Sequence, residues 1–289
     1  MSKRVKILYH HPEEFFNRYS ILMKYVSYYS EEDQQRSLNE TFGNFKQKGD
    51  SLRVLAVGTG DGSADVPVID ILQSKQCNIT YSVVEPMVAE VEKFKSLAAS
   101  KQEQGQWTRV RFEFYQTTIE NYLEESQTRV AEDNFDIIHT IHCAYTMSDP
   151  GGIFAGLFGR LERGGMLRNT IAAGPLEKLL AKAKEIHPVS RQCVGSASLR
   201  RMIQDRLPDV EINTIYKKIA LLADECFKEE SREGNMMLDF LTYTLDFRKS
   251  VSERVLSDFM EFMREECCYK RDGKLFLHKD EEDIVIFKK

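Results

Sequence analysis

The order of apolar and polar positions divides the chain into a first part with helical spacing and a middle part with a different rhythm. Between residues 12 and 50, apolar positions recur in a polar background, for example at Phe15, Tyr19, Leu22 and Val26, which predicts one or two helices. From residue 52 onward, short apolar runs alternate with longer amphipathic segments. Strands that alternate with helices in this way indicate βαβ units and a parallel sheet.

The predicted elements of the middle part follow each other in a regular order. Strands are expected over residues 52–57, 79–86, 110–117, 135–142 and 166–173, and helices over residues 64–75, 87–100, 119–126 and 151–162. Pro67 is tolerable in the first turn of its helix. Gly164 and Gly165 are expected to close the last of these helices, because glycine accepts the left-handed cap conformation.

The last third of the chain is less regular. Helices are predicted over residues 176–187, 197–207, 236–247 and 255–267, with a strand or two over residues 211–223. Residues 274–289 are expected to form a terminal strand pair. Residues 279–285, a mostly charged run between the two strands of this pair, are expected to form a solvated turn.

Composition and charge exclude several classes of protein. The chain has 289 residues, of which 42% are hydrophobic and 29% charged, an ordinary globular mix. The net charge of −5 and the absence of a basic stripe argue against a nucleic-acid partner. No apolar run is long enough to span a membrane, and the N-terminus lacks a signal-peptide core. The six cysteines show no CxxC pair or disulfide framework, so we expect reduced thiols and a cytoplasmic protein.

Candidate chemistry begins at a glycine-rich turn after the first predicted strand. Gly58, Gly60 and Gly62 alternate there, so a ligand could approach the backbone closely. The dinucleotide fingerprint places its third glycine one residue later. Asp61 and Asp65 would repel a pyrophosphate at this helix start, which disfavours a nicotinamide-dinucleotide enzyme. A cationic or uncharged ligand fits better, although the turn could also merely close a βα unit.

A second candidate residue ends the next predicted strand. Glu85 could accept hydrogen bonds from both hydroxyls of a ribose. A glycine turn, a ribose-binding acid and acids in place of phosphate-binding groups together indicate S-adenosylmethionine, whose sulfonium and ammonium are compatible with nearby carboxylates.

Residues 54–66, 82–95, 114–122 and 135–149 together resemble the class I methyltransferases, and more closely the histamine N-methyltransferase family. The resemblance extends to residues 236–247 and 273–289. It implies an α/β, Rossmann-like fold with a mostly parallel seven-stranded sheet and helices on both faces. It also implies an N-terminal helical lid on the substrate side (residues 1–50), a core that binds S-adenosylmethionine (51–175) and a C-terminal part that completes the sheet and substrate pocket (176–289).

The resemblance also assigns cofactor roles to individual residues. Gly58 matches the first cofactor-contacting glycine, Glu85 the ribose-binding acid, and Thr118 a hydroxyl near the adenine. Glu90 stands where the family has a glutamine, and Ile141 matches a residue beside the adenine or the methionine arm. Together with the turn, the candidate cofactor-binding residues are Gly58, Gly60, Gly62, Asp65, Glu85, Pro86, Glu90, Thr117, Thr118 and Ile141.

Acceptor roles follow from the same resemblance. Glu32, with Glu31 as a rival, resembles a glutamate that holds the amine. His142 stands in place of a glutamine that touches the substrate imidazole, and Tyr145 matches an aromatic wall. The candidate acceptor-binding residues are Glu32, Tyr19, Phe15, His142, Tyr145, Leu176, Leu180 and His278. Leu176 and Leu180 occupy positions where the family has tryptophans, which leaves an acceptor other than histamine open.

Structural interpretations stand beside these roles. Glu32 could be a first-turn carboxylate after an N-cap at Ser30, and His142 could be satisfied by loop backbone. His139 is expected in the core or a second layer. Aromatic residues between 9 and 29 at helical spacing are more often core than lid. No spacing of histidine, cysteine and carboxylate residues is typical of a metal site, so no metal is expected.

The sequence thus predicts a cytoplasmic, monomeric N-methyltransferase. It would transfer a methyl group from S-adenosylmethionine, with S-adenosylhomocysteine as product, to histamine or a related small amine. No obligatory catalytic residue is expected, and His142 is the one candidate. The alternatives are an enzyme for another acceptor, such as a carnosine-like dipeptide or another biogenic amine, and a non-catalytic protein that binds the cofactor.

Overall fold

The computed structural model describes residues 6–28, 36–43, 45–46, 49–127, 134–186 and 195–289. The chain forms two compact units, each combining segments that are distant in the sequence. The first contains Met1–Glu31, Ala172–Ser196 and Tyr216–Glu281, and the second contains Glu32–Ile171, Ala197–Ile215 and Glu282–Lys289. We call the first the small-sheet unit and the second the large-sheet unit.

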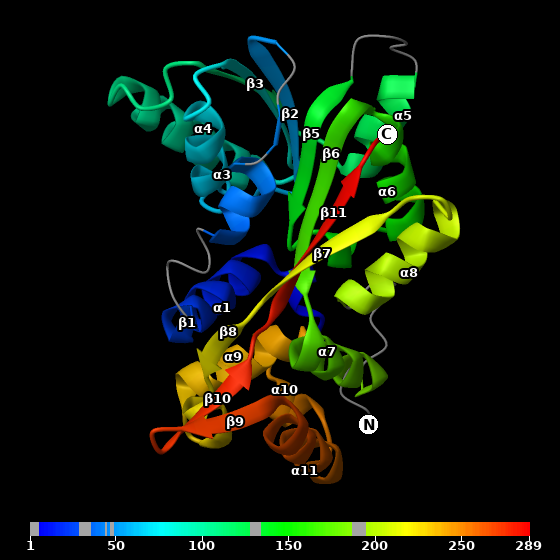
Figure 1. Ribbon diagram of the computed structural model, residues 1–289. Coiled ribbons are helices and arrows are strands. Elements are labelled where there is room, and N and C mark those ends of the chain that lie inside the picture. The colour runs from blue at the N-terminus through cyan, green and yellow to red at the C-terminus, as the bar shows by residue number, and fades with distance from the viewer. Residues whose placement is uncertain (1–5, 29–35, 44, 47–48, 128–133, 187–194) are drawn as a thin grey trace. The chain divides into compact units, whose positions relative to one another are not determined.

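The large-sheet unit is built on a seven-stranded sheet in the order β4-β3-β2-β5-β6-β11-β7 (Figure 1). Its strands are β2 (Ser51–Val57), β3 (Asn78–Val84), β4 (Val110–Tyr115), β5 (Phe135–Ile141), β6 (Leu161–Ala172), β7 (Ile212–Lys217) and β11 (Glu281–Phe287). The strands β4, β3, β2, β5 and β6 pair in parallel, with Val54 opposite both Tyr81 and Ile137. The predicted fold class, a mostly parallel seven-stranded sheet, is therefore confirmed.

Helices cover both faces of this sheet. They are α3 (Val66–Gln73), α4 (Val88–Glu103), α5 (Ile119–Gln127), α6 (Pro150–Gly159) and α8 (Ser196–Arg206), with the short helices η2 (Asn39–Gly43) and η3 (Ala144–Thr146). In Figure 1, α3 and α4 lie on one side of the sheet and α5 and α6 on the other. Because the central strands are buried on both faces, they read as near-continuous apolar runs, and β2 is buried from Val54 to Val57.

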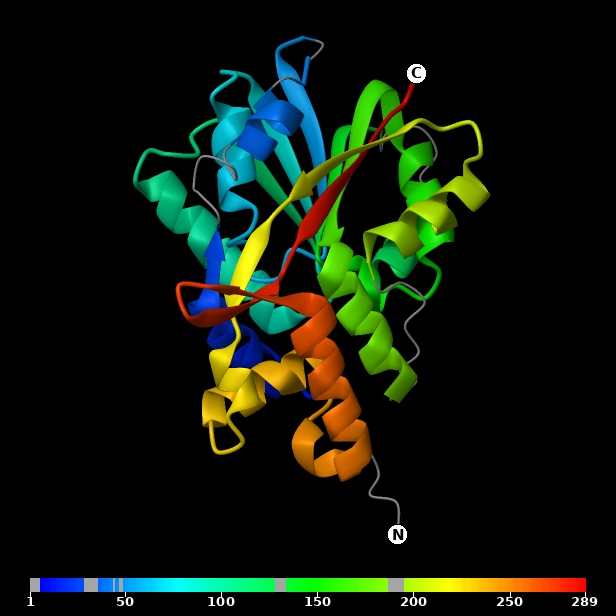
Figure 2. The same ribbon diagram turned by 60° about the horizontal axis from the view of Figure 1, so that its bottom comes forward.

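The small-sheet unit contains a four-stranded antiparallel sheet in the order β1-β8-β10-β9. Its strands are β1 (Val26–Tyr28), β8 (Ile219–Leu222), β9 (Cys268–Arg271) and β10 (Lys274–His278). Its helices are α1 (Pro12–Tyr25), α7 (Gly174–Ile186), α9 (Arg232–Thr242), α10 (Phe247–Ser250) and α11 (Glu253–Phe262), with η1 (Leu8–His10), η4 (Asp224–Phe227) and η5 (Met263–Cys267). Helix α1 packs on α9, and α11 (orange) lies beside α7 (green) in Figure 2.

The acidic residues 280–283 are buried, so the predicted solvated turn is wrong. The predicted terminal strand pair is also wrong, because β10 belongs to the four-stranded sheet and β11 to the seven-stranded sheet. None of the four acids is more than 7% exposed. Asp283 accepts hydrogen bonds from Arg168, Thr170 and Ser37 at 2.8, 2.6 and 2.8 Å. Such partners make a buried carboxylate tolerable.

The helix predicted over residues 236–247 is interrupted. Tyr243 and Asp246 have left-handed backbone conformations, with φ of 54° and 53°, and a new helix begins at Phe247. The backbone N–H groups of Asp246 and Phe247 donate to the carboxylate of Asp239 at 3.0 and 2.8 Å. This side-chain acceptor offers the backbone an alternative to helical hydrogen bonds, which accounts for the break.

Gly164 and Gly165 lie inside β6, so their predicted role as a helix cap is wrong. Helix α6 ends at Gly159, and its cap residue Arg160 is right-handed. A Cβ atom at Gly165 would lie 3.0 Å from the carbonyl oxygen of Asp136 on the neighbouring strand. The glycine therefore permits a close approach of two backbones.

In the part of the chain that the structure describes, no helix has the length and apolar character needed to cross a membrane. The functional division proposed at residues 50 and 175 remains a prediction.

The Arg168–Asp283 ion pair yields a stability prediction. Replacing Arg168 by Met leaves a buried carboxylate without its cation, because both side chains are at most 3% exposed. Breaking a buried pair costs about 3–5 kcal/mol. We expect urea denaturation to show that Arg168→Met lowers the free energy of unfolding by that amount. Lys95→Met breaks an exposed pair and should lower it by no more than about 0.5 kcal/mol. Equal losses would contradict the argument.

Candidate functional site

The glycine turn predicted from the sequence follows β2 directly. Gly58, Gly60 and Gly62 have φ of 66°, 55° and 78°, a region that side chains rarely adopt. The N–H of Gly58 donates to the carbonyl of Val84 at 2.9 Å, which continues the pairing of β2 with β3 by one residue. The turn is thus held by the neighbouring strand.

The three glycines of the turn have different surroundings. A Cβ atom at Gly58 would lie 2.4 Å from Cβ of Cys143, and one at Gly62 would lie 2.3 Å from the ring of Phe94. At Gly60, by contrast, a Cβ atom would meet nothing within 4 Å. Gly58 and Gly62 therefore allow close packing of the protein, while Gly60 borders open space where a ligand can approach the backbone.

Glu85 connects the end of β3 with this turn. One carboxylate oxygen accepts a hydrogen bond from the N–H of Gly60 at 3.0 Å, and the other accepts one from the N–H of Met87 at 3.0 Å. The residue is 6% exposed. Burial raises the pKa of Glu85, while the two N–H donors oppose that shift. The carboxylate thus lies beside Gly60, the glycine of this turn that borders open space.

Asp65 lies below the turn, in the protein interior. Its carboxylate accepts a hydrogen bond from the hydroxyl of Tyr81 at 2.6 Å, and that hydroxyl lies 2.6 Å from Nε2 of His139. Burial raises the pKa of Asp65 to about 7 and lowers the pKa of His139 to about 3. His139 therefore lies in the core, as predicted, and Asp65 anchors the start of α3. A contact of Asp65 with the cofactor remains a prediction.

The other candidate cofactor residues lie at or just beyond neighbouring strand ends. Pro86 is exposed after β3, Thr117 and Thr118 follow β4, and Ile141 ends β5. The carboxyl ends of parallel strands share one edge of the sheet, where ligands bind in open α/β folds. The fold therefore brings these positions to the edge that carries the glycine turn.

Two of these residues already have partners within the protein. Glu90, 3% exposed, pairs with Lys93 at 2.7 Å. The hydroxyl of Thr118 accepts a hydrogen bond from the N–H of Asn121 at 3.3 Å in the first turn of α5. Their contacts with a cofactor remain predictions.

His142 and Tyr145 lie together just after β5. The backbone of His142 is left-handed, with φ of 53°, and its N–H donates to the carbonyl of Thr170 at 2.9 Å. The two rings are nearly parallel, with centroids 6.3 Å apart, and Nδ1 of His142 lies 3.4 Å from the Tyr145 hydroxyl. A non-glycine residue in this conformation is uncommon and is more frequent at functional sites.

Phe15 and Tyr19, on α1, belong to a group of rings that also involves α9. We call this group the aromatic cluster; it consists of Phe15, Phe16, Tyr19, Phe240 and Tyr243. The ring of Phe240 lies 5.2 Å from Phe15 and 5.6 Å from Tyr19, and Tyr243 stacks on Phe15 at 6.5 Å. Tyr19 is 40% exposed. The sequence did not indicate Phe240 and Tyr243, because only the packing of two distant helices reveals them.

The remaining acceptor candidates lie on other elements than the rings of this cluster. Leu176 and Leu180 are buried on α7. His278, on β10, stacks on Tyr269 with ring centroids 4.4 Å apart. Glu31 and Glu32 lie outside the described residues. Among the residues that are described, no three histidine, cysteine or acidic side chains form a group that could hold a metal ion.

Comparison with known proteins gives two kinds of relative. No family model matches the chain. The chain is 25% identical over 246 residues to the histamine N-methyltransferase of Danio rerio. The matched residues cover 81% of this chain and 81% of that protein. It is 24% identical over 259 residues to carnosine N-methyltransferase 2 of Gallus gallus, with 81% and 74% covered.

A solved structure supports the fold independently. A presumed methyltransferase from Bacillus halodurans superposes with a TM-score of 0.54 at 13% identity, covering 88% of this chain and 98% of that chain. At this identity the likeness concerns the fold.

The different surroundings of the glycines predict different costs of substitution. Alanine at Gly60 or Gly62 must adopt a left-handed conformation, which costs about 1–2 kcal/mol. At Gly62 the added methyl also overlaps the ring of Phe94, and overpacking adds about 1–3 kcal/mol. We expect Gly62→Ala to unfold at lower urea concentration than Gly60→Ala. Equal midpoints in the two variants would contradict this assignment.

Proposed function

We propose that this class I methyltransferase, which resembles the histamine N-methyltransferases, transfers a methyl group from S-adenosylmethionine to a nitrogen of histamine or a related small amine. The observation that carries the proposal is the pairing of Glu85 with Gly60 at the open part of the turn. The relatives named above support the reaction type.

The residues of the turn fit this cofactor. The carboxylate of Glu85 has two oxygens, each with capacity for a further hydrogen bond. It could therefore accept a hydrogen bond from each of the two hydroxyls of a ribose. Gly60 allows a ligand to lie against the backbone. Exposed Asp61 would repel a diphosphate and tolerate a sulfonium or ammonium group. S-adenosylmethionine therefore fits the site better than a dinucleotide.

When bound, S-adenosylmethionine supplies the reactive methyl group. Glu85 would hold the ribose, Thr118 would lie near the adenine, and Ile141 would lie beside the adenine or the methionine arm. The chain itself has to orient the acceptor nitrogen, and such positioning can supply about 7–11 kcal/mol at most. This division of labour requires no nucleophile or metal from the protein.

The aromatic cluster is the proposed acceptor-binding surface. Aromatic faces attract an ammonium group, with a contribution of about 0.5–2 kcal/mol each, and they stack on an imidazole ring. Phe15 and Tyr19 were predicted for this role, and Phe240 and Tyr243 join them through packing. Glu32 is proposed to pair with the substrate ammonium.

His142 is the candidate for a proton or hydrogen-bond contact with the acceptor. It lies at the carboxyl end of β5, at the ligand-binding edge of the sheet. A neutral imidazole can accept a proton from the methylated nitrogen or from a group beside it. Tyr145, which stacks on it, would fix the orientation of the ring.

A different small acceptor is the second candidate function. Leu176 and Leu180 occupy positions where the histamine family has tryptophans, and one relative is named a carnosine N-methyltransferase. A dipeptide or another amine would suit a less aromatic surface. A protein that binds the cofactor without turnover is the remaining alternative. We also propose that the protein acts as a cytoplasmic monomer and does not bind nucleic acid, for which the net charge of −5 offers support.

Loss of the Glu85 carboxylate should weaken cofactor binding. A hydrogen bond to a charged group contributes about 1.5–3 kcal/mol, which corresponds to roughly a 10- to 150-fold change in affinity. We expect calorimetry to show a rise of that size in the Kd of S-adenosylhomocysteine for Glu85→Gln. The matched control is Glu92→Gln on α4, which breaks an exposed pair. A folded Glu85→Gln variant with unchanged Kd would contradict the cofactor assignment.

Radiolabelled cofactor and a panel of amines test the acceptor. The panel contains histamine, carnosine and simpler imidazoles. We expect cofactor-dependent labelling of at least one imidazole amine. A kcat/KM that is highest for histamine would refute the second candidate function, and no labelling of any amine would refute methyl transfer to this class of acceptor.

A further inference from the structure

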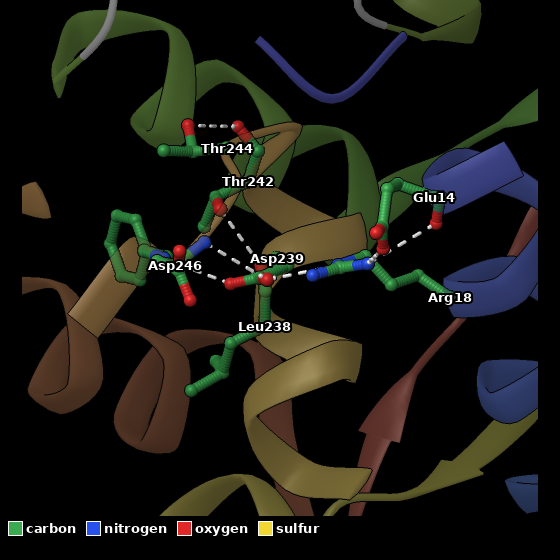
Figure 3. Close-up of polar contacts among 8 residues, drawn as sticks. Glu14, Arg18, Leu238, Asp239, Thr242, Thr244 and Asp246 are labelled. Atoms are coloured by element: carbon green, nitrogen blue, oxygen red, sulfur yellow. Dashed lines mark hydrogen bonds and ion pairs between the residues drawn. The ribbon is translucent and has the colours of Figure 1, made fainter. Parts of the chain in front are cut away.

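An ion pair lies within the contact of α1 and α9 that forms the aromatic cluster, and the proposed function assigns no role to this pair. Arg18 comes from α1 and Asp239 from α9, and Figure 3 shows their side chains pointing toward each other. The exposed fractions of the two side chains are 11% and 6%.

The carboxylate of Asp239 accepts three hydrogen bonds, which come from two other segments of the chain. Nε of Arg18 donates at 2.9 Å, and the N–H groups of Asp246 and Phe247 donate at 3.0 and 2.8 Å. Figure 3 shows Arg18 and Asp246 on either side of Asp239. Asp239 therefore joins α1, α9 and the start of α10 at one point.

Each of these bonds fixes a part of the aromatic cluster. Phe15, Arg18 and Tyr19 are spaced by three and four residues, so they share one face of α1. Phe240 follows Asp239 directly, and its ring contacts the rings of Phe15 and Tyr19. Tyr243 belongs to the left-handed segment that the Asp246 and Phe247 bonds close.

The charges of the pair depend on each other. Burial raises the pKa of Asp239, and the backbone donors and Arg18 oppose that shift. Burial acts to lower the pKa of Arg18, but hydrogen bonds to Asp239 and Glu14 outweigh it and raise the pKa. Removing either charge would leave the other poorly compensated, so the helix contact would readjust.

We propose that Arg18 and Asp239 are positioning residues that hold the aromatic cluster in the geometry that binds the acceptor. The proposal rests on the proposed function, because it treats the cluster as the acceptor-binding surface. The pair acts through the rings and does not contact the substrate. It should therefore set the affinity for the acceptor and leave the cofactor site unchanged.

Kinetics of matched variants test this role. Arg18→Gln and Asp239→Asn each remove one charge, and Arg18→Lys keeps the charge with a shorter reach. Glu14→Gln is the control, because Glu14 also pairs with Arg18 but belongs to the same helix and is 52% exposed. The acceptor is the amine, among histamine, carnosine and the simpler imidazoles of the panel, that the wild type methylates with the highest kcat/KM. S-adenosylhomocysteine binding and thermal unfolding are measured in parallel.

The expected result is a split between the kinetic constants. Arg18→Gln and Asp239→Asn should raise the KM of the acceptor at least tenfold, while kcat and the Kd of S-adenosylhomocysteine change less than twofold. The double variant should show about the effect of one single variant, since both remove the same contact. Arg18→Lys should restore most of the affinity, and Glu14→Gln should behave like wild type.

Other outcomes would overturn the proposal. A folded Arg18→Gln variant with a lower melting temperature and unchanged KM would reduce the pair to a stabilising contact. If that variant does not fold, an unchanged KM in both Arg18→Lys and Asp239→Asn leads to the same conclusion. A wild type that methylates no amine of the panel would instead refute the proposed function, and with it this role.

Discussion

The hydrogen bond from Gly60 to Glu85 is the contact on which the candidate cofactor site depends. The turn follows β2 and Glu85 follows β3 directly, and these strands are paired in parallel up to Val57 and Val84. The N–H of Gly60 reaches the carboxylate because the backbone there is left-handed. The same local geometry thus fixes a short strand-to-helix connection and the acid that is proposed to bind the ribose.

Buried carboxylates join distant segments in both units. Asp283 binds Arg168 on β6 and Ser37 near the N-terminus, and Asp239 binds Arg18. In each case two or more donors surround one carboxylate, which offsets the loss of hydration. Glu85 follows the same rule with two backbone donors. An otherwise ordinary composition can therefore bury many acids, and these acids determine which segments lie together.

The parts of the fold that local patterns specify were predictable from the sequence. The strands from β2 to β5 and the helices between them follow apolar runs and glycine or proline signals, and the glycine turn and Glu85 stand out by spacing. The acidic residues 280–283 were misjudged because four charges in a row are typical of a solvated turn. Their burial depends on cations and hydroxyls such as Arg168 and Ser37, which no local pattern reveals.

The candidate acceptor site was less predictable for the same reason. Phe15 and Tyr19 were candidates as aromatic residues of the predicted N-terminal lid, but their partners Phe240 and Tyr243 are more than two hundred positions away in the chain. A helix predicted over residues 236–247 also concealed the left-handed Tyr243, since its conformation depends on the carboxylate of Asp239. For Asp65, no local pattern indicated its contact with Tyr81, whose hydroxyl in turn contacts His139.

Under the proposed function, the two units have different roles, and this division has a consequence for specificity. The candidate cofactor residues lie on or beside strand ends of the large-sheet unit. The aromatic cluster lies on α1, on α9 and on Tyr243, which follows α9, all in the small-sheet unit. Substitutions within the cluster leave the hydrogen bonds of Gly60 and Glu85 intact. Acceptor preference can therefore change while cofactor binding persists, in keeping with relatives of similar identity that are named for different acceptors. Overall identity then carries little information about the acceptor, and the residues that hold the aromatic cluster carry more.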